Sequence, residues 1–316
     1  MPSRPGMPSR SCPRLALLAL AATLALASPP AARACSVCGC GDPQLDASDP
    51  AAASGRFRLQ LASEYLSMDA GTEGAPGSTD HLKQVSLRAD AVWSPAEWLS
   101  LLARVPYVRK DLTTTGPGAQ GPGSSLSGLG DAELGARITL LSRVDLGRGR
   151  SHGLALTGGA SLPTGSNDAR RGGERLDEHG QLGTGSFGPY AGLHYAFSQG
   201  DWYAFASVTG RFHTVNGFGY QYGEALLWTA EAQYRLGQRV AVSLGLDGRE
   251  AWADLDHGLA VESTGGLVLA ASPAAYLSVG GGMWLGVRAQ LPFYARLRGE
   301  QSVGPVLVGG VQYQAL

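Results

Sequence analysis

The sequence of 316 residues is short of charge, since only 16% of it is Asp, Glu, Lys or Arg against about 25% in an average protein. Its formal net charge is -1 and its isoelectric point is about 6.6, so we expect no nucleic acid as a partner. Cysteine is scarce as well: the 4 cysteines all precede residue 41, and a zinc ribbon with two separated cysteine pairs is not supported.

Long apolar runs are absent from most of the chain. No stretch after residue 34 reaches 18 consecutive apolar residues, so no helical membrane span is expected there. The 46 glycines are roughly twice the average share. They argue against an ordinary helical enzyme, because each glycine inside a helix costs about 1 kcal/mol relative to alanine.

Residues 1–34 have the pattern of a secretory signal peptide. Three arginines precede an apolar run over residues 15–27, which is too short to span a membrane as a helix. Residues 32–34, Ala-Arg-Ala, then supply an A-x-A cleavage pattern. We therefore predict that the mature chain begins at Cys35.

The rest of the chain alternates apolar and polar residues with a period of two. In the first run, Phe57, Leu59 and Leu61 fall on one face, and Arg58 and Gln60 fall on the other. A strand sorts residues into two faces in this way, whereas a helix would scatter them around its axis. We expect about twelve such strands, at residues 56–69, 81–94, 97–111, 128–142, 151–163, 186–198, 201–214, 222–236, 239–250, 264–279, 282–297 and 303–316.

These runs are longer than the strands of soluble proteins, which have about 5–6 residues, and long enough for tilted membrane strands of about 9–11. Short turns, such as residues 94–96, alternate with long polar connections, such as 112–127, and this is the plan of outer-membrane barrels. The sequence therefore predicts an all-β fold, a transmembrane antiparallel β-barrel of about twelve strands over residues 55–316. A soluble β-sandwich or an extracellular barrel is the alternative, and the many charges on the polar face argue against it.

Three stretches resemble landmarks of a known family: GLGDAELGAR at residues 128–137, SLPTGS at 161–166 and GTGSFG at 183–188. They occur in the same order in a broad group of bacterial outer-membrane barrel proteins regarded as transporters, including those named for the meta-pathway of phenol degradation. The resemblance implies a barrel in the Gram-negative outer membrane, and the short turns with an even strand count favour an N-terminus in the periplasm. The resemblance also implies passage of small hydrophobic or polar solutes, and it carries over no catalytic residues.

Charged residues on the polar faces are expected to point into the barrel and to line its lumen. The candidates are Arg88, Asp90, Glu133, Arg137, Glu231 and Arg235. They could form cross-strand ion pairs that close the pore, or they could line a narrow polar path and set its selectivity. Twelve strands lie between the filled barrels of about eight strands and the open porins of 16–18, so both an open and a plugged lumen fit.

The connection at residues 164–185 carries charges of both signs. We expect it to be a solvated external loop, with a cation site or an inward constriction as alternatives. An enzyme is not expected, because the G-x-S-x-G elbow of hydrolases is missing. Ser161, near Pro163, and Ser207, near His213, are candidate nucleophiles only by their proximity in the sequence.

Cys35, Cys38 and Cys40 form a Cys-x-x-Cys-x-Cys block within residues 35–54, a segment expected in the periplasm. The block resembles the CSxCGC start of certain outer-membrane proteins of unknown function. Three thiolates could hold a soft ion such as Cu(I) or Zn. The expected state is instead a disulfide in the oxidising periplasm or a lipid anchor at Cys35, with the metal site as the alternative.

Two functions therefore stand at this point. The first is transport or diffusion of small solutes through an outer-membrane barrel, with outer-membrane lipid and a small-molecule solute as partners. The alternative is a metal-handling or structural outer-membrane protein that acts through the cysteine block.

Overall fold

The computed structural model describes residues 57–71, 78–117, 123–171 and 173–315. The predicted signal peptide and the cysteine block lie outside these residues, so the model does not test the expectations about them. The described residues are almost entirely strand. None of their helices is both long and apolar enough to cross a membrane.

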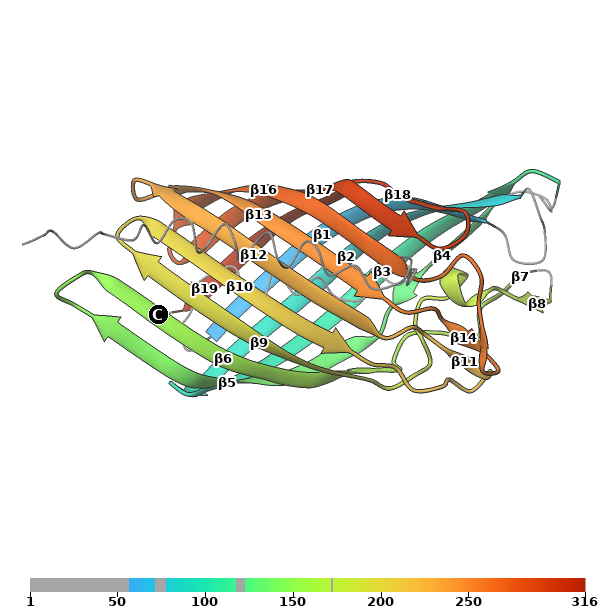
Figure 1. The fold of residues 1–316 in the computed structure, drawn as a ribbon, viewed down its shortest axis with the longest axis horizontal. Coiled ribbons are helices and arrows are strands. Elements are labelled where there is room, and N and C mark those ends of the chain that lie inside the picture. Colours follow the sequence, from blue (N-terminus) through green and yellow to red (C-terminus); the bar gives the residue numbers. More distant parts are fainter. Residues whose placement is uncertain (1–56, 72–77, 118–122, 172, 316) are drawn as a thin grey trace, which may run out of the picture. The chain divides into compact units, whose positions relative to one another are not determined.

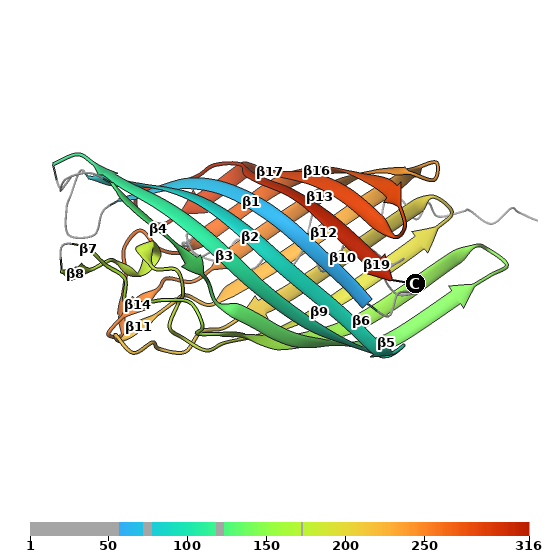
Figure 2. The ribbon, with the colours of Figure 1, turned by 180° about the vertical axis from the view of Figure 1, so that it is seen from behind.

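The strands form one antiparallel sheet that closes on itself, because β1 pairs with β2 on one side and with β19 on the other (Figures 1 and 2). The strands of the wall are β1 (Phe57–Gly71), β2 (Thr79–Ala96), β3 (Leu99–Thr115), β4 (Ser124–Leu129), β5 (Ala132–Asp145), β6 (Arg150–Leu162), β9 (Gly188–Gln199), β10 (Trp202–Arg211), β12 (Ala225–Leu236), β13 (Val240–Ala251), β16 (Gly266–Gly280), β17 (Met283–Leu297), β18 (Gln301–Val303) and β19 (Val306–Ala315). In this described part β4 continues into β5 and β18 into β19, so the 14 strands of the sheet give a twelve-stranded barrel. The predicted fold class is confirmed.

Two of the twelve strands are each interrupted by a short break, and a proline lies at or opposite each break. The alternating sequence pattern did not predict these breaks. The break between β4 and β5, at Gly130 and Asp131, faces Pro106 of β3, whose carbonyl accepts from the Gly130 N–H at 2.9 Å. Proline has no N–H to offer a neighbouring strand, so the ladder cannot run through this point. The break between β18 and β19 holds Gly304 and Pro305.

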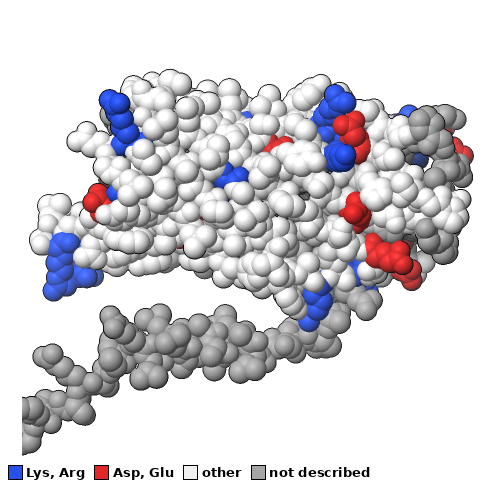
Figure 3. All heavy atoms as spheres, turned by 90° about the horizontal axis from the view of Figure 1, so that it is seen from above, with Lys and Arg blue, Asp and Glu red and all other residues white. Residues whose placement is uncertain are grey.

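The two faces of the wall are inverted relative to a water-soluble protein. Leu61 on the outer face of β1 is 50% exposed and Leu244 on β13 is 63% exposed, whereas Arg58 on the inner face is only 6% exposed. Figure 3 shows a wide band that is largely uncharged, with most of the charged groups toward the two ends. An apolar outer band around a polar interior is the arrangement that a lipid bilayer requires.

The two ends of the barrel differ. The short-turn end, at the left of Figure 1, holds the tight connections and the chain position where β19 ends. Trp93, Trp98, Trp202 and Tyr234 are found near it, and the rings of Trp202 and Tyr234 are 4.9 Å apart. Aromatic side chains at this level match an interfacial girdle. The opposite, long-loop end carries the longer connections.

The connections at the long-loop end hold the remaining short elements. These are the strand pair β7 (Arg170–Arg171) and β8 (Glu174–Arg175), the 3-10 turn η3 (Glu178–Gly180), and the small sheet of β11 (Tyr220–Gln221), β14 (Leu255–Asp256) and β15 (Leu259–Ala260). The first three belong to the connection between β6 and β9, and the small sheet joins the two connections that follow β10 and β13.

The lipid-facing assignment predicts a position-dependent cost of charge. Leu246→Arg places a guanidinium on the outer face of β13, where the leucine is 41% exposed, and should lower the free energy of unfolding by about 2–4 kcal/mol. Leu146→Arg is the matched control, because Leu146 is 89% exposed in the turn after β5. Urea unfolding of protein folded into lipid vesicles measures both changes. Equal costs at the two positions would contradict the assignment of the outer face.

Candidate functional site

The barrel interior is polar and is the candidate functional site. Its inward-facing side chains alternate with the lipid-facing ones and are mostly charged or hydroxylic. Apolar clusters of buried residues are small in the described part of the chain; one of them joins Leu66, Met68 and Leu82 near the long-loop end. An interior of this kind is not a dry core, and it can solvate a polar path.

One group of ion pairs runs along the inner face of the wall, from β2 to β10. Arg104 of β3 lies between two acids, with Nε 2.5 Å from Asp90 Oδ1 and Nη1 3.4 Å from Glu133 Oε2. Arg211 of β10 donates to Glu133 from Nη1 at 2.8 Å. Beside this chain, Arg88 Nη2 is 3.6 Å from Glu64 Oε2. In this group three arginines are thus balanced by three carboxylates.

A second group of ion pairs lies on a different part of the inner wall, on β12, β13 and β17. Arg288 pairs with Glu231, and its Nη2 is 3.1 Å from Asp247 Oδ2. Asp247 also accepts from Thr229 Oγ1 at 2.6 Å and from Gln290 Nε2 at 3.2 Å. Each carboxylate oxygen of Asp247 therefore has donors, which is what a buried charge requires.

Glycines make the first group possible. Arg211 reaches Glu133 across β9 and β6, and a side chain at Gly159 would collide with the hydroxyl of Tyr190. The Tyr190 ring instead occupies this space, next to Gly135, and the Arg211 guanidinium carbon lies 5.1 Å from its centroid. The glycine richness of the sequence thus serves the interior of the barrel at these positions.

The structure brings some of the candidate lumen residues together and separates others. Arg88, Asp90, Glu133 and Glu231 are buried on the inner face, at 4–9% exposure. Arg137 is half-buried, and its Nε donates to Thr157 Oγ1 at 3.4 Å. Arg235 is exposed near the end of β12, beside the short turn to β13. Arg235 is therefore not part of either group of ion pairs.

The lumen-lining residues predicted from the sequence did not include three arginines that form most of these ion pairs: Arg104, Arg211 and Arg288. Each lies in an alternating run with inward parity, so the signal was present in the sequence. Their partners are 14 to 78 residues away, and only the strand order shows that these charges meet.

The connection of residues 163–187, here called the inward segment, lies only partly in solvent: most of the described residues in 163–177 are exposed, whereas residues 178–186 are buried or half-buried. Lys110 on the inner face of β3 donates to the carbonyl oxygens of His179 at 2.9 Å and of Gln181 at 2.5 Å. Gln181 is 1% exposed, and its side chain binds the backbone of Ala169 and Leu176. The expectation of a solvated loop therefore holds for the β7–β8 hairpin and is wrong for residues 178–186, which form an inward constriction.

Neighbouring connections hold the inward segment from the other side. Tyr222 Oη donates to the Glu178 carbonyl at 3.0 Å, and Asn216 Nδ2 donates to the Thr184 carbonyl at 3.1 Å. Below this level, the barrel wall and the segment together line a space of about 90 Å³ that includes Arg88, Glu133 and Gln181.

Asp131 joins the three landmark stretches at one point. Its Oδ1 accepts from the Gly165 N–H at 2.9 Å, and its Oδ2 accepts from the Thr184 N–H at 2.7 Å and from Thr184 Oγ1 at 2.6 Å. Gly165 and Gly183 approach each other so closely that a side chain on either would collide with the other's backbone. The landmarks thus describe one physical junction between the wall and the inward segment.

Metal binding and nucleophilic catalysis each need side chains in a defined geometry, which the structure shows for the described residues. In the part of the chain that the structure describes, no group of three or more His, Cys, Asp or Glu side chains is arranged to hold a metal. Ser207 Oγ and His213 Nδ1 are buried without a hydrogen-bond partner among the described residues. The pairing of nucleophile and base that a serine hydrolase needs is thus not assembled between them.

The ion pairs predict a stability effect. Glu133→Gln leaves Arg104 and Arg211 buried with one fewer carboxylate, and we expect the free energy of unfolding to fall by about 3 kcal/mol. Arg148→Gln is the control, since Arg148 is exposed and 4.0 Å from Asp145, and it should change this quantity by less than about 1 kcal/mol. Urea titrations in vesicles measure both. Similar values for the two variants would show that the Glu133 pairs do not support the interior.

The fold and the landmarks agree with known proteins. A family model described as "Putative MetA-pathway of phenol degradation" matches residues 61–303. Among solved structures, an outer membrane channel from Pseudomonas putida F1 superposes with a TM-score of 0.63 at 14% identity, over 86% of this chain and 99% of that one. This similarity supports the twelve-stranded outer-membrane barrel fold.

Two further structures are more distant. The translocator domain of the autotransporter NalP from Neisseria meningitidis has a TM-score of 0.43 at 11% identity, over 83% of this chain and 88% of that one. A Pseudomonas aeruginosa FadL homologue has a TM-score of 0.40 at 12% identity, over 85% and 94%. No curated protein sequence matches the chain.

The resemblance inferred from the sequence is confirmed. The family model covers most of the barrel, including all three landmark stretches that meet at Asp131. The protein is therefore an outer-membrane β-barrel that belongs to the family described as "Putative MetA-pathway of phenol degradation".

Proposed function

We propose that this protein is a channel that lets small solutes cross the outer membrane through the barrel interior. The long loops face the outside and the short turns face the periplasm, as in other bacterial barrels, so the strand that begins at Phe57 starts on the periplasmic side. The family's description names phenol degradation, which makes small aromatic compounds the first solutes to test.

One observation carries the proposal: the interior holds a series of separate spaces, each lined in part by polar side chains. A space of about 240 Å³ opens at the long-loop end, and one of about 90 Å³ follows beneath the inward segment. Two spaces of about 40 Å³ lie further along the inner wall, one beside Arg137 and Tyr190 and one beside Arg288. A barrel that served only as an anchor would need no such series.

The charged groups set what can pass. Paired charges such as Arg104 with Asp90 present both signs to a passing solute, so a polar molecule exchanges water for hydrogen bonds along the wall. The inward segment narrows this path, and Lys110 fixes its position. Passage therefore depends on how firmly Lys110 holds the carbonyls of His179 and Gln181.

Planar-bilayer recording tests the proposal directly. Purified full-length protein should give discrete current steps in KCl, and phenol added to one side should cross vesicles that contain the protein faster than empty vesicles. Folded protein that gives no steps and no excess phenol flux would overturn the proposed function.

The two lysines of the chain supply a matched pair of variants. Lys110→Met removes the donor that binds the inward segment, so we expect larger and noisier current steps than in the wild type. Lys83→Met is the control, because Lys83 is exposed on β2 and its ammonium group does not hold the inward segment. An unchanged conductance in Lys110→Met, with the folded barrel intact, would contradict the role of this lysine.

A further inference from the structure

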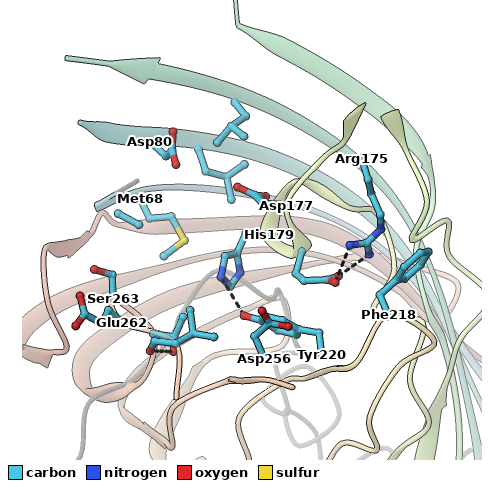
Figure 4. A pocket seen from close by; sticks show the side chains of 16 residues that line it. Met68, Asp80, Arg175, Asp177, His179, Phe218, Tyr220, Asp256, Glu262 and Ser263 are labelled. Carbon is cyan, nitrogen blue, oxygen red and sulfur yellow. Dashed lines mark hydrogen bonds and ion pairs between the residues drawn. The ribbon is translucent and has the colours of Figure 1, made fainter. Parts of the chain in front are cut away.

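A cavity at the long-loop end has a chemistry of its own. Its volume is about 240 Å³, and Figure 4 shows the side chains around it. One wall is apolar and comes from three adjacent strands, with Met68 on β1, Leu82 on β2 and Leu112 on β3. Met68 and Leu82 are each 4% exposed, so this wall is firmly packed.

The facing wall comes from the inward segment and from the connection after β10. Residues 175–179 contribute to it, together with Phe218 and Tyr220. His179 Nε2 is 3.5 Å from Tyr220 Oη, and this hydroxyl donates to Asp254 at 2.7 Å. The facing wall of the cavity is thus built in part from the segment that narrows the path.

The volume matches a ligand with one ring. An apolar cavity of about 150 Å³ is enough to hold benzene, whereas sites for drug-sized molecules span about 300–1,000 Å³. At about 240 Å³, the cavity accommodates a single ring with a short substituent. The apolar wall then faces the ring, and the substituent faces the edge of the cavity.

The one arginine that lines the cavity is already compensated. Arg175 donates to both carboxylate oxygens of Glu178 at 2.8 Å, and its guanidinium carbon lies 3.7 Å from the centroid of Phe218. The hydrogen bond to Glu178 raises the pKa of Arg175. Arg175 and Glu178 together therefore add little net charge to the cavity.

Of the four other carboxylates that line the cavity, Asp256 lies 2.8 Å from His257 Nδ1. The remaining three, Asp80, Asp177 and Glu262, have no Lys or Arg partner among the described residues. Asp80 accepts from Thr114 Oγ1 at 2.5 Å and Asp177 from the Gly180 N–H at 2.6 Å, and both donors are neutral. Most of the acidic atoms visible in Figure 3 lie toward the same end. The local potential therefore favours a cation.

We propose that this cavity binds a small monocyclic amine, with its ring against Met68 and Leu82 and its ammonium group toward the carboxylates of Asp80, Asp177 and Glu262. The inference rests on the proposed channel function, because it names a class of solute for the same path. Burial of the ring is favourable, and ammonium–carboxylate hydrogen bonds are among the strong ones. A monocyclic acid of the same size is repelled.

Three probes with the same ring and different charge test the proposal: benzylamine, benzyl alcohol and benzoate. Full-length protein in nanodiscs is titrated with each at low salt, and heat of binding is recorded. Benzylamine should bind most tightly and benzoate most weakly, and added NaCl should weaken benzylamine binding. Benzyl alcohol or benzoate binding as tightly as benzylamine would overturn the proposal.

Variants locate the binding. Asp80→Asn and Glu262→Gln should each weaken benzylamine binding by about tenfold and leave benzyl alcohol unchanged. Asp168→Asn is the control, since Asp168 lies in the inward segment but pairs with Arg170 at 3.0 Å and does not line the cavity. If Asp80→Asn fails to fold, Glu262→Gln decides alone. An effect of the control equal to that of Glu262→Gln would contradict the assignment.

The binding titration needs no flux, so it is separate from the channel test. A preference for benzylamine in a protein that gives no conductance would overturn the channel function and leave the cavity assignment standing. Conductance without any preference among the three probes would overturn the cavity assignment and leave the channel function standing.

Discussion

The carboxylate of Asp131 is the contact on which the interior of this barrel depends. It lies where the wall is broken opposite Pro106, and it accepts hydrogen bonds from Gly165 and Thr184. These two residues stand near the two ends of the inward segment, so one side chain fixes both ends to the wall. With its ends fixed, residues 178–186 of the segment enter the barrel, while its β7–β8 hairpin stays exposed, and the buried part divides the lumen into separate spaces.

The division gives the two sides of the segment different chemistry. Beneath it, basic and acidic side chains are paired, as in the contacts of Arg104 and Arg211 with Glu133. Above it, carboxylates such as Asp80 and Glu262 face the cavity without a basic partner in the described residues. A solute that enters from the long-loop end thus meets an apolar wall and negative charge first, and a balanced polar path afterwards.

The strands were predictable because their signal is local. Each run shows the period of two in its own residues. All twelve expected runs correspond to strands of the barrel, and most of their ends agree within a few residues. The break at Gly130 was not predictable from its own run, because its cause, Pro106, lies on the neighbouring strand. The Gly304-Pro305 pair could have indicated the second break, which lies between β18 and β19.

The candidate site was predictable only in part. Inward parity identified Arg88, Asp90, Glu133 and Glu231, but Arg235 has the same parity and lies too close to the strand end to be enclosed. The inward segment was misjudged because its charged composition is the same whether it faces water or a polar lumen. Its anchor, Lys110, is 69 and 71 residues from the two carbonyls that it binds.

Hydrogen–deuterium exchange of the full-length protein in nanodiscs tests most directly whether the inward segment is held inside the barrel. The amides of Leu182 and Gly183 donate to Ser166, and that of Thr184 donates to Asp131, so peptides covering residues 181–186 should exchange as slowly as the strands of the wall. The turn at residues 146–149 should exchange fast. Exchange of residues 181–186 at the rate of that turn would show that the segment is not held in the lumen.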